Sequence, residues 1–216
     1  MPLGATPAIA RASRSRGAKA MANIGQSGAG RDATIWRMIG WGGAVVLLLT
    51  PLAAMRFTNE VQWDETDFIV MGMLMLAVGI PLELVVRASR SWSYRLGAAV
   101  ALVTSFLIIW ANLAVGLIGS ENNPANDLYF LVILLGIAAA AIGRFRPLAM
   151  ANAMILTAVG HLLVTLVALM LRSDEPGVPA AVRLIEIVGN LVFAGLYLGS
   201  AWLFRRASRD QSSSSS

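Results

Sequence analysis

Apolar residues occur along this chain in six long runs, each separated from the next by a short polar stretch. Each run is close to the ~20 residues that a helix needs to cross the ~30 Å hydrocarbon core of a bilayer. Backbone groups cannot stay unpaired in lipid, so each run is expected to be a helix. The pattern predicts an all-α integral membrane protein, a bundle of six transmembrane helices. The expected spans, within a membrane domain at 33–205, are about 35–54, 67–86, 96–118, 128–146, 148–171 and 182–204.

The charges in the polar stretches predict the orientation. Residues 1–37, 87–95, 143–147 and 205–216 face one side and hold 14 of the 17 lysines and arginines. Most of the acids fall on the opposite side. Because the basic side of such proteins is cytoplasmic, both termini are expected in the cytoplasm.

The two ends of the chain lack long apolar runs. Residues 1–32 are basic and rich in Ala, Gly and Ser, which predicts a disordered cytoplasmic N-tail. An organellar transit peptide is the alternative, and Met21 is an alternative start to Met1. Residues 206–216 end in a serine run and are expected to be a disordered C-terminal tail.

Composition narrows the function classes. The chain is 57% hydrophobic and only 13% charged, about half the charge of ordinary soluble proteins. The net charge of +5 is explained by the orientation of the loops, so no nucleic-acid partner is expected. With no cysteine, one histidine and no recognised catalytic or nucleotide-binding motif, the sequence predicts no catalytic residue, no cofactor and no metal site.

His161 falls near the middle of the fifth span. An ionisable group inside a membrane is a functional candidate, through proton relay or ligand binding. The alternative is a neutral imidazole that hydrogen-bonds to a neighbouring helix. The sequence leaves both open.

Other polar residues inside the spans are also candidates, each with a structural alternative. Glu186 and Asn190 share one face of the sixth helix and line a cavity in the functional interpretation, whereas an interfacial pair with Arg183 would leave Glu186 locally satisfied. Glu83 follows Pro81, which bends the helix, and is spaced to pair with Arg87. The deep amide Asn112 is explained by helix–helix hydrogen bonding.

The loop 119–127 between the third and fourth spans is short and rich in amides. A tight turn in which the asparagines bond to their own backbone accounts for this composition. An acidic outer patch that contacts a cation or a partner is the alternative. The candidate residues of this loop are Glu121, Asn122, Asn123 and Asp127.

Small and aromatic residues indicate how the helices pack and where the membrane surfaces lie. Gly195 and Gly199 form a G-x-x-x-G in the sixth helix, and Gly136 with Ala140 repeats the spacing, which allows close packing in the bundle or self-association. Amphipathic rings are expected at the interfaces, namely Trp63, Trp92, Tyr94, Tyr129 and Trp202.

Three stretches carry a resemblance to a known group of proteins. They are Trp63-Asp-Glu-Thr-Asp67, Trp110-Ala-Asn112 through Asn126, and Arg144-Phe-Arg-Pro147. Over roughly the second to fifth helices the chain resembles a family of small multi-pass bacterial inner-membrane proteins without an assigned activity. The resemblance implies a bacterial inner-membrane setting and brings no cofactor or site residue.

The sequence favours a non-catalytic membrane protein, an accessory or assembly subunit of a membrane complex, whose partners are the lipid bilayer and other membrane subunits. The alternative is a small oligomeric transporter or channel with an ionisable intramembrane residue on its path. A membrane enzyme is least favoured.

Overall fold

The computed structural model describes residues 37–58, 62–119, 123–171 and 179–213. In these ranges the chain is helical and has no strand. Six of its helices are long and apolar enough to cross a membrane, which confirms the predicted fold class. The helices are Arg37–Ala54, α2 (Glu65–Ala88), α3 (Trp92–Ala114), the short 3-10 helix η1 (Pro124–Asn126), α4 (Asp127–Ile142), α5 (Pro147–Leu171) and α6 (Ala180–Ser213).

The chain divides into two compact units, 1–68 and 69–216. The described part of the first unit is mainly the helix Arg37–Ala54, in which no residue is buried. Its Thr50 hydroxyl donates to the Val46 carbonyl, 2.9 Å away, so this polar side chain is satisfied within the helix. The apolar surface that remains is suited to lipid.

The start of α2 also lies in the first unit and is built by a local sequence signal. Asp64 Oδ1 accepts hydrogen bonds from the backbone N–H groups of Thr66 (2.8 Å) and Asp67 (3.0 Å). Asp67 Oδ2 accepts in return from the Asp64 N–H at 3.0 Å. The rings of Trp63 and Phe68 pack edge to face across this cap, 5.3 Å apart. The motif Trp63–Phe68 is therefore a capping box with a hydrophobic staple, and it fixes where the helix begins.

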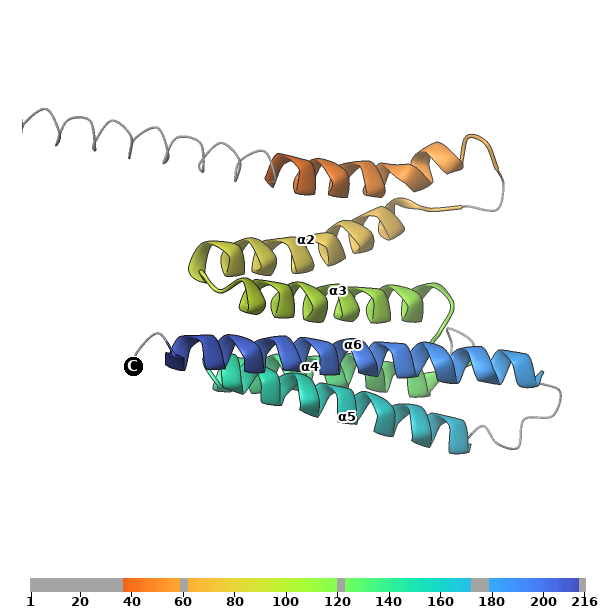
Figure 1. Cartoon of the computed structure of the whole chain (residues 1–216). Helices are drawn as coiled ribbons and strands as arrows, with labels where there is room; N and C mark the ends of the chain where they lie inside the picture. The colour runs from red at the N-terminus through yellow and green to blue at the C-terminus, as the bar shows by residue number, and fades with distance from the viewer. Residues whose placement is uncertain (1–36, 59–61, 120–122, 172–178, 214–216) are drawn as a thin grey trace, which may run out of the picture. The chain divides into compact units, whose positions relative to one another are not determined.

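In the second unit, α6 packs against both α3 and α5, and α4 packs against α5 (Figure 1). The contact between α3 and α6 is close because Gly97 presents no side chain: the ring of Phe204 lies over it. Ser200 donates to the Gly97 carbonyl at 2.8 Å, and Tyr94 packs edge to face on Phe204 at 5.0 Å. Farther along, the hydroxyls of Ser105 and Tyr197 lie 2.9 Å apart. These contacts fix the register of the two helices.

The packing of α4 against α5 uses the small residues that the sequence singles out. A Cβ atom at Gly136 would overlap the Thr157 hydroxyl of α5. Ala140, one turn later, is also buried. In contrast, a Cβ atom added at Gly195 or Gly199 on α6 would meet no atom within 4 Å, so the G-x-x-x-G face is uncovered within the described residues.

Two helix ends differ from the expected spans because glycines interrupt the apolar runs. The third helix begins earlier than expected, at Trp92, and ends at Ala114 instead of 118. Gly116 and Gly119 follow with φ of 76°, a conformation that a helix cannot continue through. The fourth helix ends at Ile142 instead of 146, because the backbone turns at Gly143 and Arg144 has φ of 52°.

The C-terminal end of the last helix also differs. We expected the span to end near 204 and a disordered tail at 206–216, but α6 continues to Ser213. Ala207 is fully buried, so the helix still packs on the bundle beyond Phe204. Ser93 donates to Asp210 at 3.4 Å, a further contact that holds this extension to the start of α3.

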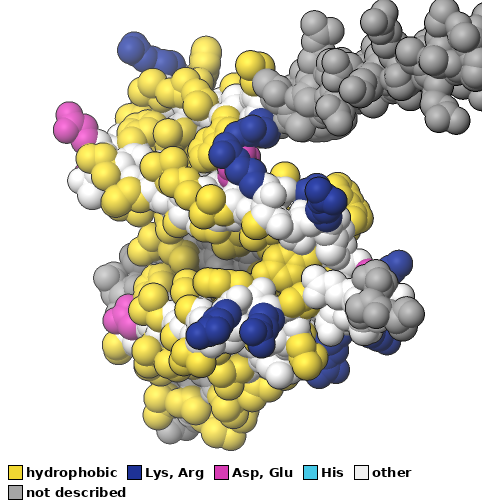
Figure 2. Space-filling model, turned by 90° about the vertical axis from the view of Figure 1, so that its left-hand side faces the viewer, with side chains coloured by type: hydrophobic (Ala, Val, Ile, Leu, Met, Phe, Trp, Pro, Cys, Tyr) yellow, Lys and Arg dark blue, Asp and Glu magenta, His cyan; other side chains and the backbone are white. Residues whose placement is uncertain are grey.

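The second unit has two chemically different ends. At one end α2, α4 and α6 finish and α3 and α5 begin, and we call it the arginine end. Figure 2 looks onto this end and shows Lys and Arg side chains around it. Eight arginines lie there: Arg87, Arg90, Arg95, Arg144, Arg146, Arg205, Arg206 and Arg209. We call the other end, where α3 finishes and α4 and α6 begin, the asparagine end.

Candidate functional site

The site lies at the asparagine end and centres on a short segment of non-helical backbone, Val115–Gly119. Leu117 is 8% exposed and Ile118 is fully buried, so these two residues lie inside the bundle, whereas Val115 at the start of the segment is 64% exposed. Irregular backbone is tolerated at membrane depth only where protein or water satisfies its polar groups. The residues that satisfy it are polar side chains from α3, η1 and α6.

Asn126 forms the first part of this arrangement. Its Oδ1 accepts from the Ile118 N–H at 3.1 Å, and its Nδ2 donates to the Ile118 carbonyl at 3.3 Å. One side-chain amide therefore pairs with both backbone groups of one residue, as a neighbouring strand would. Asn123 adds a second donor to the same carbonyl at 3.1 Å. Asn112, on the last turns of α3, donates to the Asn126 carbonyl at 2.8 Å and so links α3 to η1.

Glu186 and Asn190, one turn apart on α6, hold the segment from the other side. Glu186 Oε1 accepts from the Gly119 N–H at 3.0 Å. Asn190 Nδ2 donates to the Leu117 carbonyl at 3.4 Å and to the Glu186 carbonyl at 2.9 Å. Because α6 and α5 are packed together, these contacts join the end of α3 to the core of the bundle.

His161 lies on the α5 side of this cluster, 1% exposed. Its ring is between two aromatic rings, with centroids 4.8 Å from Tyr129 of α4 and 6.1 Å from Phe193 of α6. The Tyr129 hydroxyl is 2.9 Å from Thr165 Oγ1, which donates to the His161 carbonyl at 2.9 Å. The imidazole also lies near Asn190, which brings α4, α5 and α6 together at one point.

Three buried polar atoms of the cluster have no hydrogen-bond partner within the described residues. They are Asn112 Oδ1, Asn190 Oδ1 and His161 Nε2. Buried polar groups are nearly always satisfied, by protein or by an ordered guest. The His161 imidazole lies against the Asn190 side chain, so these two groups can satisfy one another. Asn112 Oδ1 is then left without a partner within the described residues.

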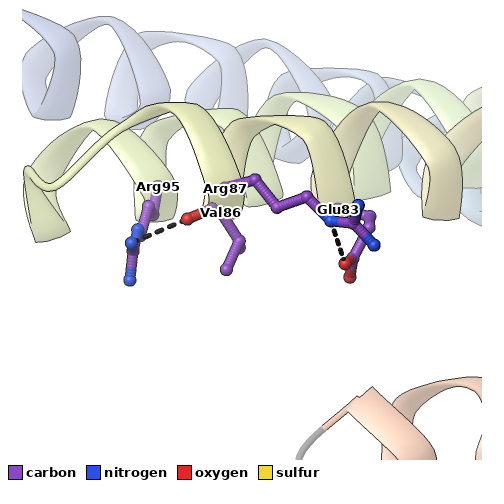
Figure 3. Close-up of polar contacts among 4 residues, drawn as sticks. All are labelled: Glu83, Val86, Arg87 and Arg95. Atoms are coloured by element: carbon purple, nitrogen blue, oxygen red, sulfur yellow. Dashed lines mark hydrogen bonds and ion pairs between the residues drawn. The ribbon is translucent and has the colours of Figure 1, made fainter. Parts of the chain in front are cut away.

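The structure brings four of the sequence candidates together, namely His161, Glu186, Asn112 and Asn190, while Glu83 lies apart from them. Glu83 is near the arginine end of α2, where the predicted pair with Arg87 forms at 2.7 Å (Figure 3). Arg95 at the start of α3 donates to the carbonyls of Ser89 and Val86, each at 2.7 Å, so this arginine holds the turn between α2 and α3. Glu83 therefore belongs to an ion pair near the C-terminal end of α2.

The predicted loop residues divide into three groups. Glu121 and Asn122 lie outside the described residues. Asn123 Oδ1 accepts from the Ala125 N–H at 3.0 Å, so it bonds to its own backbone as expected for a tight turn, and also reaches Ile118. Asp127 is exposed in the first turn of α4, where an acid suits the positive end of the helix dipole.

Three residues of the cluster were not sequence candidates: Asn126, Tyr129 and Thr165. Asn126 looks like a helix cap, but its side chain makes no capping bond in α4. Tyr129, expected near a membrane interface, is fully buried among the helices. Tyr94 is 8% exposed, and its hydroxyl donates to the Phe145 carbonyl at 2.7 Å. A tyrosine near a span end suits either environment, so composition gives no signal to separate them.

The side chains of this site can form hydrogen bonds and electrostatic interactions, and their contacts with the backbone fix their positions. Within the described ranges, no group of three or more His, Asp or Glu side chains is placed to hold a metal ion. Comparison with protein-family models, with curated proteins and with solved structures finds no match for this chain.

Proposed function

We propose that the chain is a non-catalytic protein of a bacterial inner membrane, an accessory or assembly subunit of a larger membrane complex. The observation that carries the proposal is the use of its intramembrane polar residues. Asn112, Asn126, Glu186 and Asn190 are all bonded to the backbone of the segment 115–119 or to its neighbours. They hold the helices together, as expected of polar residues in a structural, non-catalytic subunit.

The orientation in this proposal follows from the charges. The arginine end carries eight arginines and, among the described acids, Glu83 and Asp210. Asp127 and Glu186 lie toward the asparagine end. Basic ends of membrane proteins stay in the cytoplasm, so the arginine end and both termini are placed there. The resemblance to bacterial inner-membrane proteins supports the same membrane.

A subunit needs surfaces for its partners, and two are available. In α2, which has 24 residues, Met71 is the one fully buried residue, and the large apolar side chains of Ile69, Met73 and Leu84 are exposed. On α6 the face around Gly195 and Gly199 is open enough for close approach of another helix. Lipid covers such faces by default, and partner helices replace lipid where a complex forms.

The test uses the absence of cysteine in the chain. A photo-crosslinker attached at Met73→Cys, which is 57% exposed on α2, is activated in native membranes before purification in a mild detergent. We expect one dominant protein to be crosslinked in stoichiometric amount. The matched control, Ala151→Cys at a fully buried position of α5, should give no crosslink. Recovery of the chain alone from both variants would contradict a subunit role.

A small oligomeric transporter or channel is the second candidate, and one observation favours it. The imidazole of His161 is buried against the side chain of Asn190, and Glu186 lies one turn from Asn190 on α6. Such a cluster inside a membrane is typical of ion and proton paths. Flux through reconstituted vesicles should then be lost in His161→Ala and kept in Glu83→Gln. Unchanged flux in His161→Ala would remove this residue from the path.

A further inference from the structure

The turn between α4 and α5, residues 143–147, holds two residues in a conformation that their side chains disfavour. Arg144 and Phe145 have φ of 52° and 55°, in the left-handed region that glycine adopts without strain. A Cβ atom makes this region unfavourable, because it comes too close to the following carbonyl oxygen. Strained residues of this kind cluster at ligand-binding and other functional positions. The turn is therefore a candidate for a role beyond connecting two helices.

The side chains of the turn do not stabilise the fold. Arg144, Phe145 and Arg146 are all exposed, and none of them forms a side-chain hydrogen bond, ion pair or ring contact with another described residue. The backbone is fixed instead: the Phe145 N–H donates to the Ala140 carbonyl at 3.0 Å, and the Phe145 carbonyl accepts from the Tyr94 hydroxyl at 2.7 Å. The turn thus presents three outward side chains on a well-held backbone.

The turn lies at the boundary between hydrocarbon and headgroups. Ile142, the last residue of α4, is 84% exposed, and Leu148, the second residue of α5, is 56% exposed. Both helices are long and apolar enough to cross a membrane, so these exposed apolar side chains are suited to acyl chains. Arginines next to such positions extend their guanidinium groups to the interface. Arg144 and Arg146 are therefore placed at the depth of lipid phosphates.

The positive charge at this end is not neutralised by the protein. Tyr94 joins the turn to the end of α6, since its hydroxyl bonds to Phe145 and its ring packs on Phe204. Arg205, next to Phe204, is exposed and adds a further charge. Among the described residues of the arginine end, Arg87 is the only arginine in an ion pair. The arginines of the turn and of α6 are thus available to an external anion.

The ligand that fits this surface carries both a phosphate and an apolar part. A guanidinium group pairs with phosphate through two parallel hydrogen bonds, and basic sites between membrane helices bind anionic headgroups. We propose that the turn 143–147 binds an anionic phospholipid, with Arg144 and Arg146 on its phosphate and Phe145 against its acyl chains. Membrane orientation alone accounts for many arginines at one end, but not for an exposed arginine and phenylalanine in left-handed conformation. The site is independent of whether the protein is a subunit or a transporter.

The test is the thermal unfolding of the purified full chain in detergent. Phosphatidylglycerol and phosphatidylcholine with the same acyl chains are titrated separately, and sodium phosphate is compared with sodium chloride at equal ionic strength. A ligand that binds only the folded state raises the unfolding temperature in a saturable way. We expect a saturable rise with phosphatidylglycerol alone. An equal response to the two lipids, or a rise with inorganic phosphate as large as that with phosphatidylglycerol, would overturn the proposal.

A pair of double variants separates the turn from overall charge. Each arginine near an anionic membrane surface contributes about fivefold to binding, so Arg144→Gln with Arg146→Gln should raise the half-saturating phosphatidylglycerol concentration about thirtyfold. Arg90→Gln with Arg209→Gln is the matched control, because it removes the same charge from exposed positions at the same end. The control should stay close to the wild-type midpoint. Equal weakening in the two double variants would contradict a site at the turn.

A glycine variant keeps the test decisive if the double variant does not fold. Arg144→Gly removes the left-handed strain together with the guanidinium group. Without added lipid it should unfold at a higher temperature than the wild type, yet it should need about fivefold more phosphatidylglycerol for half-saturation. An unchanged lipid midpoint in this variant would show that Arg144 does not contact the headgroup.

Discussion

Asn112 and Asn126 are joined by a hydrogen bond of 2.8 Å from the side-chain amide of the first to the backbone carbonyl of the second. This bond links the last turns of α3 to η1, while the Asn126 side chain pairs with Ile118 of the non-helical segment 115–119. The two asparagines therefore close a loop whose interior would otherwise expose polar backbone groups to an apolar environment. Asn190 and Glu186 anchor the closed loop to α6.

Removing the Asn126 side chain should destabilise the bundle. Asn126→Ala leaves the buried N–H and carbonyl of Ile118 without this partner, and a buried unsatisfied group costs about 1–3 kcal/mol. We expect a loss in that range, measured by unfolding in a series of SDS fractions in mixed micelles. The control is Asn123→Ala: Asn123 is partly exposed and shares the Ile118 carbonyl, so its loss should be smaller. Equal effects would contradict the central role given to Asn126.

Two glycine substitutions form a matched pair. Gly136→Ala puts a Cβ atom onto the Thr157 hydroxyl, whose position is fixed by its bond to the Ala153 carbonyl, and overpacking of this kind costs about 1–3 kcal/mol. Gly195→Ala meets no atom within 4 Å and should change stability by less than ~1 kcal/mol. Unfolding of both purified variants checks the pair. A larger effect at Gly195 in the monomer would show that its face is covered.

The pair formed by Tyr129 and Thr165 should show a measurable coupling energy. Their hydroxyls lie 2.9 Å apart and link α4 to α5 beside His161. Hydrogen bonds between membrane helices average about 0.6 kcal/mol in double-mutant cycles. We expect Tyr129→Phe, Thr165→Val and the double variant to give a coupling of that order. Strict additivity of the two single variants would mean that the contact carries no net energy.

The proposed orientation predicts a labelling pattern in intact cells. Cysteine introduced at Asp127, exposed at the asparagine end, should react with a membrane-impermeant maleimide. Cysteine at Ser213, exposed at the end of α6, should react only after the membrane is permeabilised. Because the natural chain has no cysteine, each signal comes from one position. The reverse pattern would place the arginine end outside.

Helix number and most helix positions are predictable from the sequence because the length of an apolar run is set by membrane thickness. The capping of α2 by Asp64 and the pair of Glu83 with Arg87 are predictable too, since both depend on residues three or four positions apart. The early end of α3 is not: Val115, Leu117 and Ile118 are as apolar as the helix before them. Only the glycines at 116 and 119 hint at a break.

Four members of the candidate site were predictable from the sequence, but the way they come together was not. Single polar residues within apolar runs stand out, which identifies His161, Glu186, Asn112 and Asn190. Their meeting around one buried segment depends on how α3, α5 and α6 pack, and spacing along the chain carries no such information. Tyr129 and Asn126 were missed because each has a common local explanation at the end of a span.

Hydrogen exchange at the Ile118 and Gly119 amides is the sharpest test of the buried segment. Both N–H groups are bonded to side chains from other elements, to Asn126 Oδ1 at 3.1 Å and to Glu186 Oε1 at 3.0 Å, in a segment that follows the end of α3. We predict slow exchange in the wild type, comparable with the neighbouring turns of α3, and acceleration at Ile118 in Asn126→Ala. Fast exchange of both amides in the wild-type protein would contradict a locked, buried segment at the centre of the site.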